Sequence, residues 1–108
     1  MTHNMLGASL KTCHWGYFDA TLPPAMTISS GDEVVINTVS GGPQNLPGAE
    51  YHVPQELLDL HAAGLPAMPG HILTGPVAVQ GAMPGDVLQI DILDVSLRQD
   101  WGLSLIHI

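Results

Sequence analysis

The sequence predicts a mainly β domain of short strands and hairpins, forming a sandwich-like or barrel-like sheet with one short helix. The chain has 108 residues, and its 12 glycines and 9 prolines divide it into short segments, which favours strands and turns over a helix bundle. β-Branched runs such as Val34-Val35-Ile36 directly follow turn residues. A hydrophobic content of 45% is sufficient to bury the core of one small domain.

Two Gly-Asp turns predict two β-hairpins. The first hairpin joins a strand ending at Ile28 to the strand 34–36 through a turn at 30–32. The second joins the strand 77–79 to a longer apolar run through a turn at 84–86. Two copies of one hairpin are compatible with this pattern, but Gly-Asp is too common in turns to establish an internal duplication.

The longer apolar run, residues 87–95, is expected to be the longest strand. Apolar side chains alternate as far as Ile92 and then continue on the other face from Leu93. Either both faces are covered, or a bulge shifts the alternation by one residue. We expect Ile90 and Ile92 to be buried, so that Ile90→Ala costs about 2 to 5 kcal/mol of stability.

One short helix is expected after Pro54. Proline suits a first helical position, several leucines supply an apolar face, and Gly64 is a stop signal. The following stretch, "PAMPGHILTGP", contains too many prolines for a regular element. It therefore places His71 on or just after a loop, at the mouth of a hairpin that turns through Thr74-Gly75-Pro76.

Charge argues against nucleic acid and anionic membranes as partners. Only Lys11 and Arg98 are basic against ten carboxylates, which gives a formal net charge of -8. No run approaches the roughly 18 apolar residues of a membrane span, and the N-terminal stretch lacks the order of a signal peptide. We therefore expect a cytoplasmic protein whose partner is a small molecule or another protein. Cys13 is the single cysteine, so no intrachain disulfide can form.

The six histidines contain no H-x-H, H-x-x-H or H-x-x-x-H pair, so a metal site has to be assembled from distant segments. His14 and His71 are the best candidates. His61 is expected to be an exposed residue of the short helix. Cys13 and His14 are a poor catalytic dyad, because adjacent residues of a strand point to opposite faces.

The stretch "CHWGYFDATLPP" contains His14 and further candidate site residues. Trp15 and Tyr17 can form the walls of a pocket, and Asp19 can bind a cation or orient an imidazole. The alternative is structural: Trp15 and Phe18 are core residues, a backbone carbonyl binds His14, and Asp19 caps a turn.

Two blocks, "HWGYFDATLPPAMTISSGDEVVINTVSGGP" and "MPGHILTGPVAVQGAMPGDVLQIDILDVSLRQDWG", closely resemble the amino-terminal part of the acetamidase/formamidase family. The resemblance covers Thr12 to Gly102. It includes the histidine-tryptophan start, the proline pair, the Gly-Asp turns, the double glycine, the H-I-L-T-G-P turn and the closing Trp-Gly. It implies a β-rich fold and the hydrolysis of formamide-like or acetamide-like substrates to a carboxylate and ammonia.

The resemblance also implies a metal-dependent enzyme. A divalent ion polarises the poorly electrophilic amide carbonyl and lowers the pKa of bound water to about 7. Zinc is one candidate, but nitrogen and oxygen ligands suit several ions. The metal ligands implied by the resemblance are His14, Asp19 and His71, of which Asp19 and His71 are also the catalytic candidates. The implied substrate-binding groups are Trp15, Tyr17, Thr74 and the backbone of Gly75.

We expect three segments: a mobile N-terminus over residues 1–11, an acetamidase/formamidase-like N-terminal portion over 12–102, and a non-native tail over 103–108. The tail "LSLIHI" departs from the family pattern and is similar to translated sequencing-adapter sequence. Family chains are much longer, and their later Gly/Asp/His-rich segment has no counterpart here. We therefore expect a fragment that is inactive alone, from a parent that is a homo-oligomer. The alternative is a β-rich binding or assembly module without catalytic activity.

Overall fold

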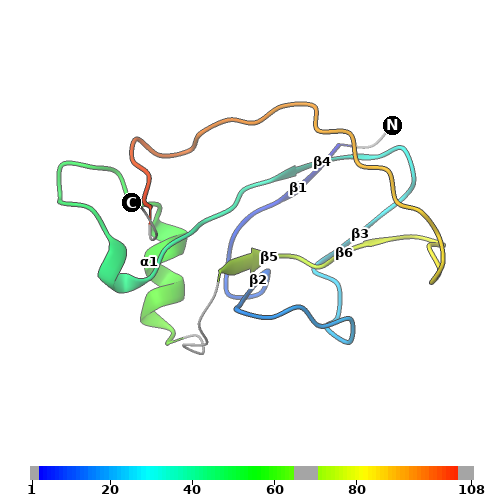
Figure 1. The fold of residues 1–108 in the computed structure, drawn as a ribbon, viewed down its shortest axis with the longest axis horizontal. Coiled ribbons are helices and arrows are strands. Elements are labelled where there is room, and N and C mark those ends of the chain that lie inside the picture. Colours follow the sequence, from blue (N-terminus) through cyan, green and yellow to red (C-terminus); the bar gives the residue numbers. More distant parts are fainter. Residues whose placement is uncertain (1–2, 65–70, 105–108) are drawn as a thin grey trace.

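The computed structural model describes residues 3–64 and 71–104, and the backbone of this part is β-rich, as predicted (Figure 1). No described strand exceeds four residues. The strands are β1 (His3–Leu6), β2 (Cys13–Trp15), β3 (Met26–Ile28), β4 (Glu33–Ile36), β5 (Ile72–Thr74) and β6 (Val77–Val79). The helices are the 3-10 helix η1 (Pro43–Asn45) and the α-helix α1 (Gln55–Ala62).

The described strands pair two by two, and each pair joins segments that are distant in the sequence. β1 lies parallel to β4, β2 antiparallel to β5, and β3 parallel to β6. A single sheet of the sandwich or barrel kind is therefore not shown by these residues.

Both predicted hairpins are wrong, although their turns are present. Asp32 N donates to Ser29 O at 3.0 Å, so the first turn forms, but the strands on its two sides enter different sheets. The β3–β6 ladder is extended at both ends, by Ala25 N to Pro76 O at 2.8 Å and by Gln80 N to Ile28 O at 2.7 Å. A tight turn sets the local direction of the chain, whereas tertiary packing selects the partner of a strand.

Residues 87–97 form an extended segment that joins no sheet of the described part. Among the described residues, no backbone–backbone hydrogen bond reaches this segment. Ile90 is 74% exposed and Ile92 is 79% exposed, so the prediction of a long strand with a buried face is wrong for this chain. The physical reason is that a strand buries a face and satisfies its backbone only against a partner.

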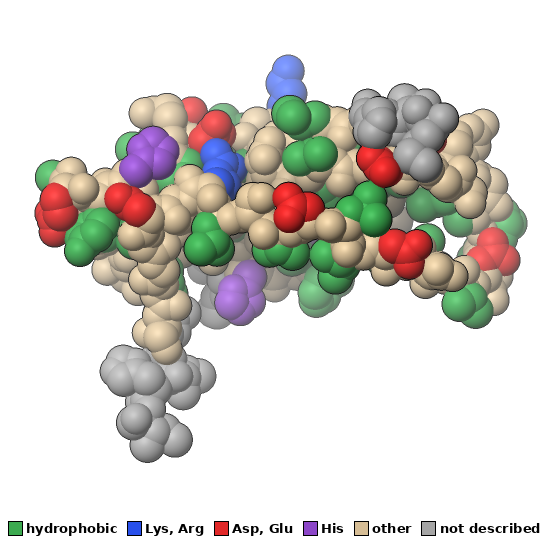
Figure 2. Space-filling view, turned by 90° about the horizontal axis from the view of Figure 1, so that it is seen from above, with side chains coloured by type: hydrophobic (Ala, Val, Ile, Leu, Met, Phe, Trp, Pro, Cys, Tyr) green, Lys and Arg blue, Asp and Glu red, His purple; other side chains and the backbone are tan. Residues whose placement is uncertain are grey.

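The segment nevertheless has a defined course. It runs along the top of the molecule in Figure 1, and Figure 2 shows hydrophobic and acidic side chains on the face seen from that side. Beyond it, Arg98 donates to Thr38 O at 3.2 Å and to the Glu56 carboxylate at 3.1 Å. Trp101 Nε1 donates to His52 O. These contacts attach the end of the segment to the region around α1.

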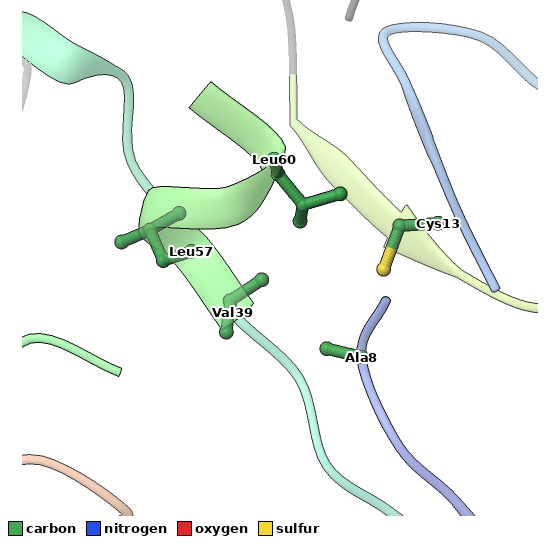
Figure 3. Packing of buried hydrophobic residues seen from close by; sticks show 5 residues of the cluster. All are labelled: Ala8, Cys13, Val39, Leu57 and Leu60. Atoms are coloured by element: carbon green, nitrogen blue, oxygen red, sulfur yellow. The ribbon is translucent and has the colours of Figure 1, made fainter. Parts of the chain in front are cut away.

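The helix α1 forms where it was predicted and carries the core. Leu57 and Leu60 are fully buried, and Gly64 N closes the helix end by donating to His61 O at 3.1 Å. The core cluster consists of Ala8, Cys13, Val39, Leu57 and Leu60 (Figure 3). None of the helices in the described ranges has the length and apolarity needed to cross a lipid bilayer.

The predicted terminal segments are only partly described. Residues 3–11 include β1 and one member of the core cluster, Ala8. Residues 1–2 of the expected N-terminal segment and 105–108 of the expected tail lie outside the described residues.

Candidate functional site

The β2–β5 pair brings together the two segments that carry the predicted site. Its register places His14 opposite Leu73 and Trp15 opposite Ile72. The next step along the pair is a hydrogen bond from Gly16 N to His71 O at 2.9 Å. The segments around His14 and His71 are therefore neighbours in space, as an assembled site requires.

The two faces of this pair have different surroundings, because side chains alternate along a strand. Cys13 belongs to the core cluster and Ile72 packs against it, so the face that also carries Trp15 and Thr74 is turned toward the core. His14 lies on the opposite face. The predicted site residues are thus divided between the two faces.

His14 is half-buried and lies beside Tyr17, with ring centroids 5.2 Å apart and ring planes at 51°. Phe18, which the structural alternative placed in the core, is 92% exposed. The outer face around His14 is therefore formed by a partly accessible imidazole and a phenol ring.

Asp19 is exposed and closes a turn. Its Oδ1 atom accepts hydrogen bonds from Thr21 N at 2.8 Å and from Thr21 Oγ1 at 2.6 Å. The hydrogen bond from the Thr21 hydroxyl is the largest cause that lowers the pKa of Asp19 below its ordinary value, and positive charge on His14 adds a smaller lowering. At neutral pH Asp19 is therefore an anion within electrostatic range of His14.

His71 is exposed and lies in the loop before β5, where the sequence placed it. The hairpin expected there does not form, because β5 pairs with β2 and β6 pairs with β3. The carbonyl of His71 is held by Gly16 while its side chain is accessible.

Thr74 and Gly75 make contacts within the fold. Thr74 Oγ1 lies 3.6 Å from Cys13 Sγ, on the core side of the pair. Gly75 is buried, has φ +137°, and donates its backbone N–H to Thr12 O at 2.8 Å. The Gly75 N–H is thus already engaged with the chain.

The two aromatic candidates lie against different histidines. Tyr17 is beside His14, whereas Trp15 lies beside His61, with ring centroids 6.0 Å apart and planes at 34°. The expectation that His61 is an exposed helical residue is wrong, because its side chain is half-buried and its Nε2 lies 2.9 Å from Gly41 O. The available signal was its spacing, since Leu57 and His61 share one helix face at i and i+4.

The chain matches the model of the Acetamidase/Formamidase family over residues 8–107. This chain belongs to the acetamidase/formamidase family. Every predicted site residue lies within the matched range.

Two relatives of this family member cover short stretches. A formamidase of Methylophilus methylotrophus is 50% identical over 36 residues, which cover 32% of this chain and 9% of that protein. An acetamidase of Mycolicibacterium smegmatis is 59% identical over 45 residues, which cover 33% of this chain and 11% of that protein. The matched stretches thus span about a tenth of the length of these relatives. No solved structure matches the chain.

The described residues of this acetamidase/formamidase family member do not by themselves fit a catalytic metal ion. No group of three or more His, Cys, Asp or Glu side chains that could hold one is present in residues 3–64 and 71–104. His14 and Asp19 are near each other, but Asp19 Oδ1 already accepts two hydrogen bonds from Thr21. Catalytic metal sites in hydrolases ordinarily use about three protein ligands.

Proposed function

We propose that this chain is part of an enzyme that hydrolyses small linear amides, such as formamide or acetamide, to a carboxylate and ammonia. The observation that carries the proposal is the family match over residues 8–107. The names of the two relatives, formamidase and acetamidase, support the same substrate class.

The reaction defines what the site must do. Water attacks the carbonyl carbon and loses a proton; the C–N bond then breaks, and the nitrogen leaves as ammonia after gaining a proton. In our proposal the accessible imidazole of His71 accepts the proton from water, because its backbone is fixed by Gly16, its side chain is open to solvent, and imidazole is the commonest general base in enzymes. Asp19 is an anion near the His14 imidazole, and this pair lies on the segment next to His71.

As an alternative role for the same residues, we propose a divalent metal ion, with zinc as one candidate, bound by His14, Asp19 and His71 together with further ligands; an imidazole that binds the ion would not then be the base. The described residues do not complete a three-ligand group, so we derive no step of the reaction through the ion. When bound, such an ion polarises a carbonyl group or activates water. Metal content of the purified parent protein, measured by elemental analysis before and after chelation, tests this part.

The proposed substrate is neutral, which is consistent with a chain that has two basic residues against ten carboxylates. Nucleic acid and anionic membranes are not among the proposed partners. A cytoplasmic location and a homo-oligomeric parent are also part of the proposal, and size-exclusion chromatography with light scattering of the parent tests the oligomer.

The test of the site is mutation in the longer parent protein, with ammonia release from formamide and acetamide as the measurement. We expect His71→Ala to reduce kcat by about 100-fold or more, the usual contribution of a general base, and His14→Ala also to reduce turnover. Both variants should stay folded, because an accessible side chain contributes little packing. His52→Ala is the matched control, since His52 is exposed and its described contacts are made by its backbone.

Normal activity of His71→Ala in the parent contradicts the proposed base. Unfolding of His14→Ala, shown by circular dichroism, instead supports a structural role for that residue.

The alternative function, a binding or assembly module, is favoured by the exposed apolar residues of 87–97. A folded parent that releases no ammonia from either amide with any added divalent ion would support this alternative.

A further inference from the structure

We infer that His61 is a positioning residue that fixes Trp15, and through it the strand β2 that carries His14, against α1. The proposed mechanism does not use His61. The catalytic consequence of the inference rests on the proposed function, whereas its structural part does not.

The first support is the anchor of the imidazole. His61 Nε2 lies 2.9 Å from Gly41 O, and a carbonyl oxygen can only accept a hydrogen bond, so Nε2 carries a proton. His61 lies in the last turn of α1, where its own carbonyl accepts the N–H of Gly64 at 3.1 Å. Both the ring and the backbone of His61 are therefore fixed.

The carbonyl oxygen that accepts the His61 hydrogen bond belongs to a glycine, Gly41. Gly41 has φ +100°, a conformation that other residues rarely adopt, and a Cβ atom there would lie 3.1 Å from Leu103 Cδ2. The direction of the Gly41 carbonyl toward His61 thus strongly favours glycine at this position. Gly41 is the first residue of the double glycine noted in the sequence, and the contact with His61 gives that motif a structural reason.

The second observation concerns the other ring nitrogen, whose burial has a cost that other contacts must offset. Within the described part of the chain, His61 Nδ1 is buried and has no hydrogen-bond partner. Since Nε2 is protonated, Nδ1 is a bare acceptor in a neutral ring. Burying an acceptor without a hydrogen-bond partner costs free energy, so this placement of the ring needs favourable contacts elsewhere. The placement is maintained by the hydrogen bond to Gly41 O and by the Trp15 ring, whose centroid lies 6.0 Å from that of the His61 ring.

The third support is the position of Trp15 in the ladder. Trp15 lies between His14, on the outer face, and Gly16, whose N–H holds the carbonyl of His71. His61 therefore lies behind the ladder, on the core side, and contacts the residue that connects the two candidate site segments. A shift of Trp15 would move both neighbours, and a displacement of about 1 Å at reacting groups can reduce rates 100-fold.

The tautomer of His61 is the first test, and it uses the unmodified chain. Long-range ¹H–¹⁵N NMR spectra distinguish protonated from unprotonated ring nitrogens. We expect the neutral His61 ring to carry its proton on Nε2, with Nδ1 unprotonated. A proton on Nδ1 alone would overturn the inference, because Nε2 could then not donate to Gly41.

The contact with Trp15 is the second test, and it uses fluorescence. The chain has two tryptophans, so Trp101→Phe leaves Trp15 as the single emitter. In this background we expect His61→Ala to raise the acrylamide quenching constant of Trp15 about twofold, because one side of the indole loses its cover. His61→Gln keeps a donor without the ring, and His61→Phe keeps a ring without the donor, so both should give intermediate values. Leu58→Ala, on the exposed side of the same helix, is the control.

Equal quenching in the His61 variants and the Leu58→Ala control would overturn the inference. If His61→Ala does not fold, the quenching constants of the His61→Gln and His61→Phe variants and the tautomer of the unmodified chain still test the inference. In the active parent we expect His61→Phe to lower kcat about tenfold with a smaller change in KM. An unchanged kcat would overturn the catalytic part, whereas an inactive unmodified parent would overturn the proposed function and leave the fluorescence test of His61 standing.

Discussion

At the scale of the residue, Asp19 shows how a near neighbour sets the state of a charged group. Both hydrogen bonds to its Oδ1 come from Thr21, two positions along the chain. They stabilise the carboxylate over the carboxylic acid and so lower the pKa of Asp19. The groups that set this state lie close to Asp19 in the sequence, and the folded chain holds them in place around its carboxylate.

Thr21→Val tests this assignment. It removes the hydroxyl donor at 2.6 Å and keeps the backbone donor, so we expect the pKa of Asp19 to rise toward its ordinary value. Because the folded pKa is lowered, the hydrogen bond stabilises the fold above about pH 4 and is lost as the pH falls through the folded pKa. Carboxyl ¹³C NMR during a pH titration measures the change, with Thr27→Val as the control. An unaltered Asp19 titration in Thr21→Val would show that Thr21 is not the cause.

Residues whose environment is local were predictable, and residues whose environment is tertiary were not. The turn at Asp19 and the loop position of His71 follow from neighbouring prolines, glycines and threonine. His61 is a polar residue on a short helix, so composition favoured an exposed position. Its partner Gly41 lies 20 positions away, and nothing in the local sequence reveals that contact.

At the scale of the element, the same distinction separates α1 from the strands. The place of α1 was predicted to within one residue at its start, because helix signals and helix hydrogen bonds are local. Of its leucines, Leu57 and Leu60 are buried, whereas Leu58 is exposed. The strands at 34–36 and 77–79 were also found, within β4 and β6. Their partners were not, since turn residues indicate where a chain reverses and not which strand it meets.

A pair of alanine substitutions measures this difference. Leu57 is fully buried in the core cluster, so Leu57→Ala should cost about 2 to 5 kcal/mol of unfolding free energy. Ile90 is 74% exposed, so Ile90→Ala should cost less than about 0.5 kcal/mol, in contrast to the expectation from its alternating pattern. Urea denaturation of this chain gives both values. A comparable loss for the two variants would mean that residues 87–97 bury a face in solution.

At the scale of the whole molecule, apolar surface and an incomplete ligand set occur together. Leu88, Ile90 and Ile92 alternate as a strand would, yet all three are more than 60% exposed, at 63%, 74% and 79%. The described residues also lack a three-ligand group for a metal ion. Both features are consistent with a chain whose matched stretches span about a tenth of the length of its two relatives.

We therefore expect this 108-residue chain to release no more ammonia from formamide or acetamide than a metal-only control. The reason is that a metal-dependent hydrolase needs about three protein ligands, an open position and a proton acceptor, and the described residues do not complete this set. The purified chain is incubated with each amide and a panel of divalent ions. Saturable, metal-dependent turnover that disappears in His71→Ala would make this chain a complete small amidase.

The pairing of distant strands has a consequence for how fast the chain can fold. Cys13 and Thr74, which face each other in the β2–β5 ladder, are 61 positions apart, and the β3–β6 pair is similarly remote. Closing such loops costs entropy before any ladder hydrogen bond forms, and domains dominated by non-local contacts fold in milliseconds to seconds. During synthesis β2 and β3 must wait for residues 72–79 to leave the ribosome, whereas Val39 and Ala8, which pack with the leucines of α1, precede the helix in the chain. Stopped-flow refolding of the Trp101→Phe variant, followed by Trp15 fluorescence, should accordingly take milliseconds to seconds.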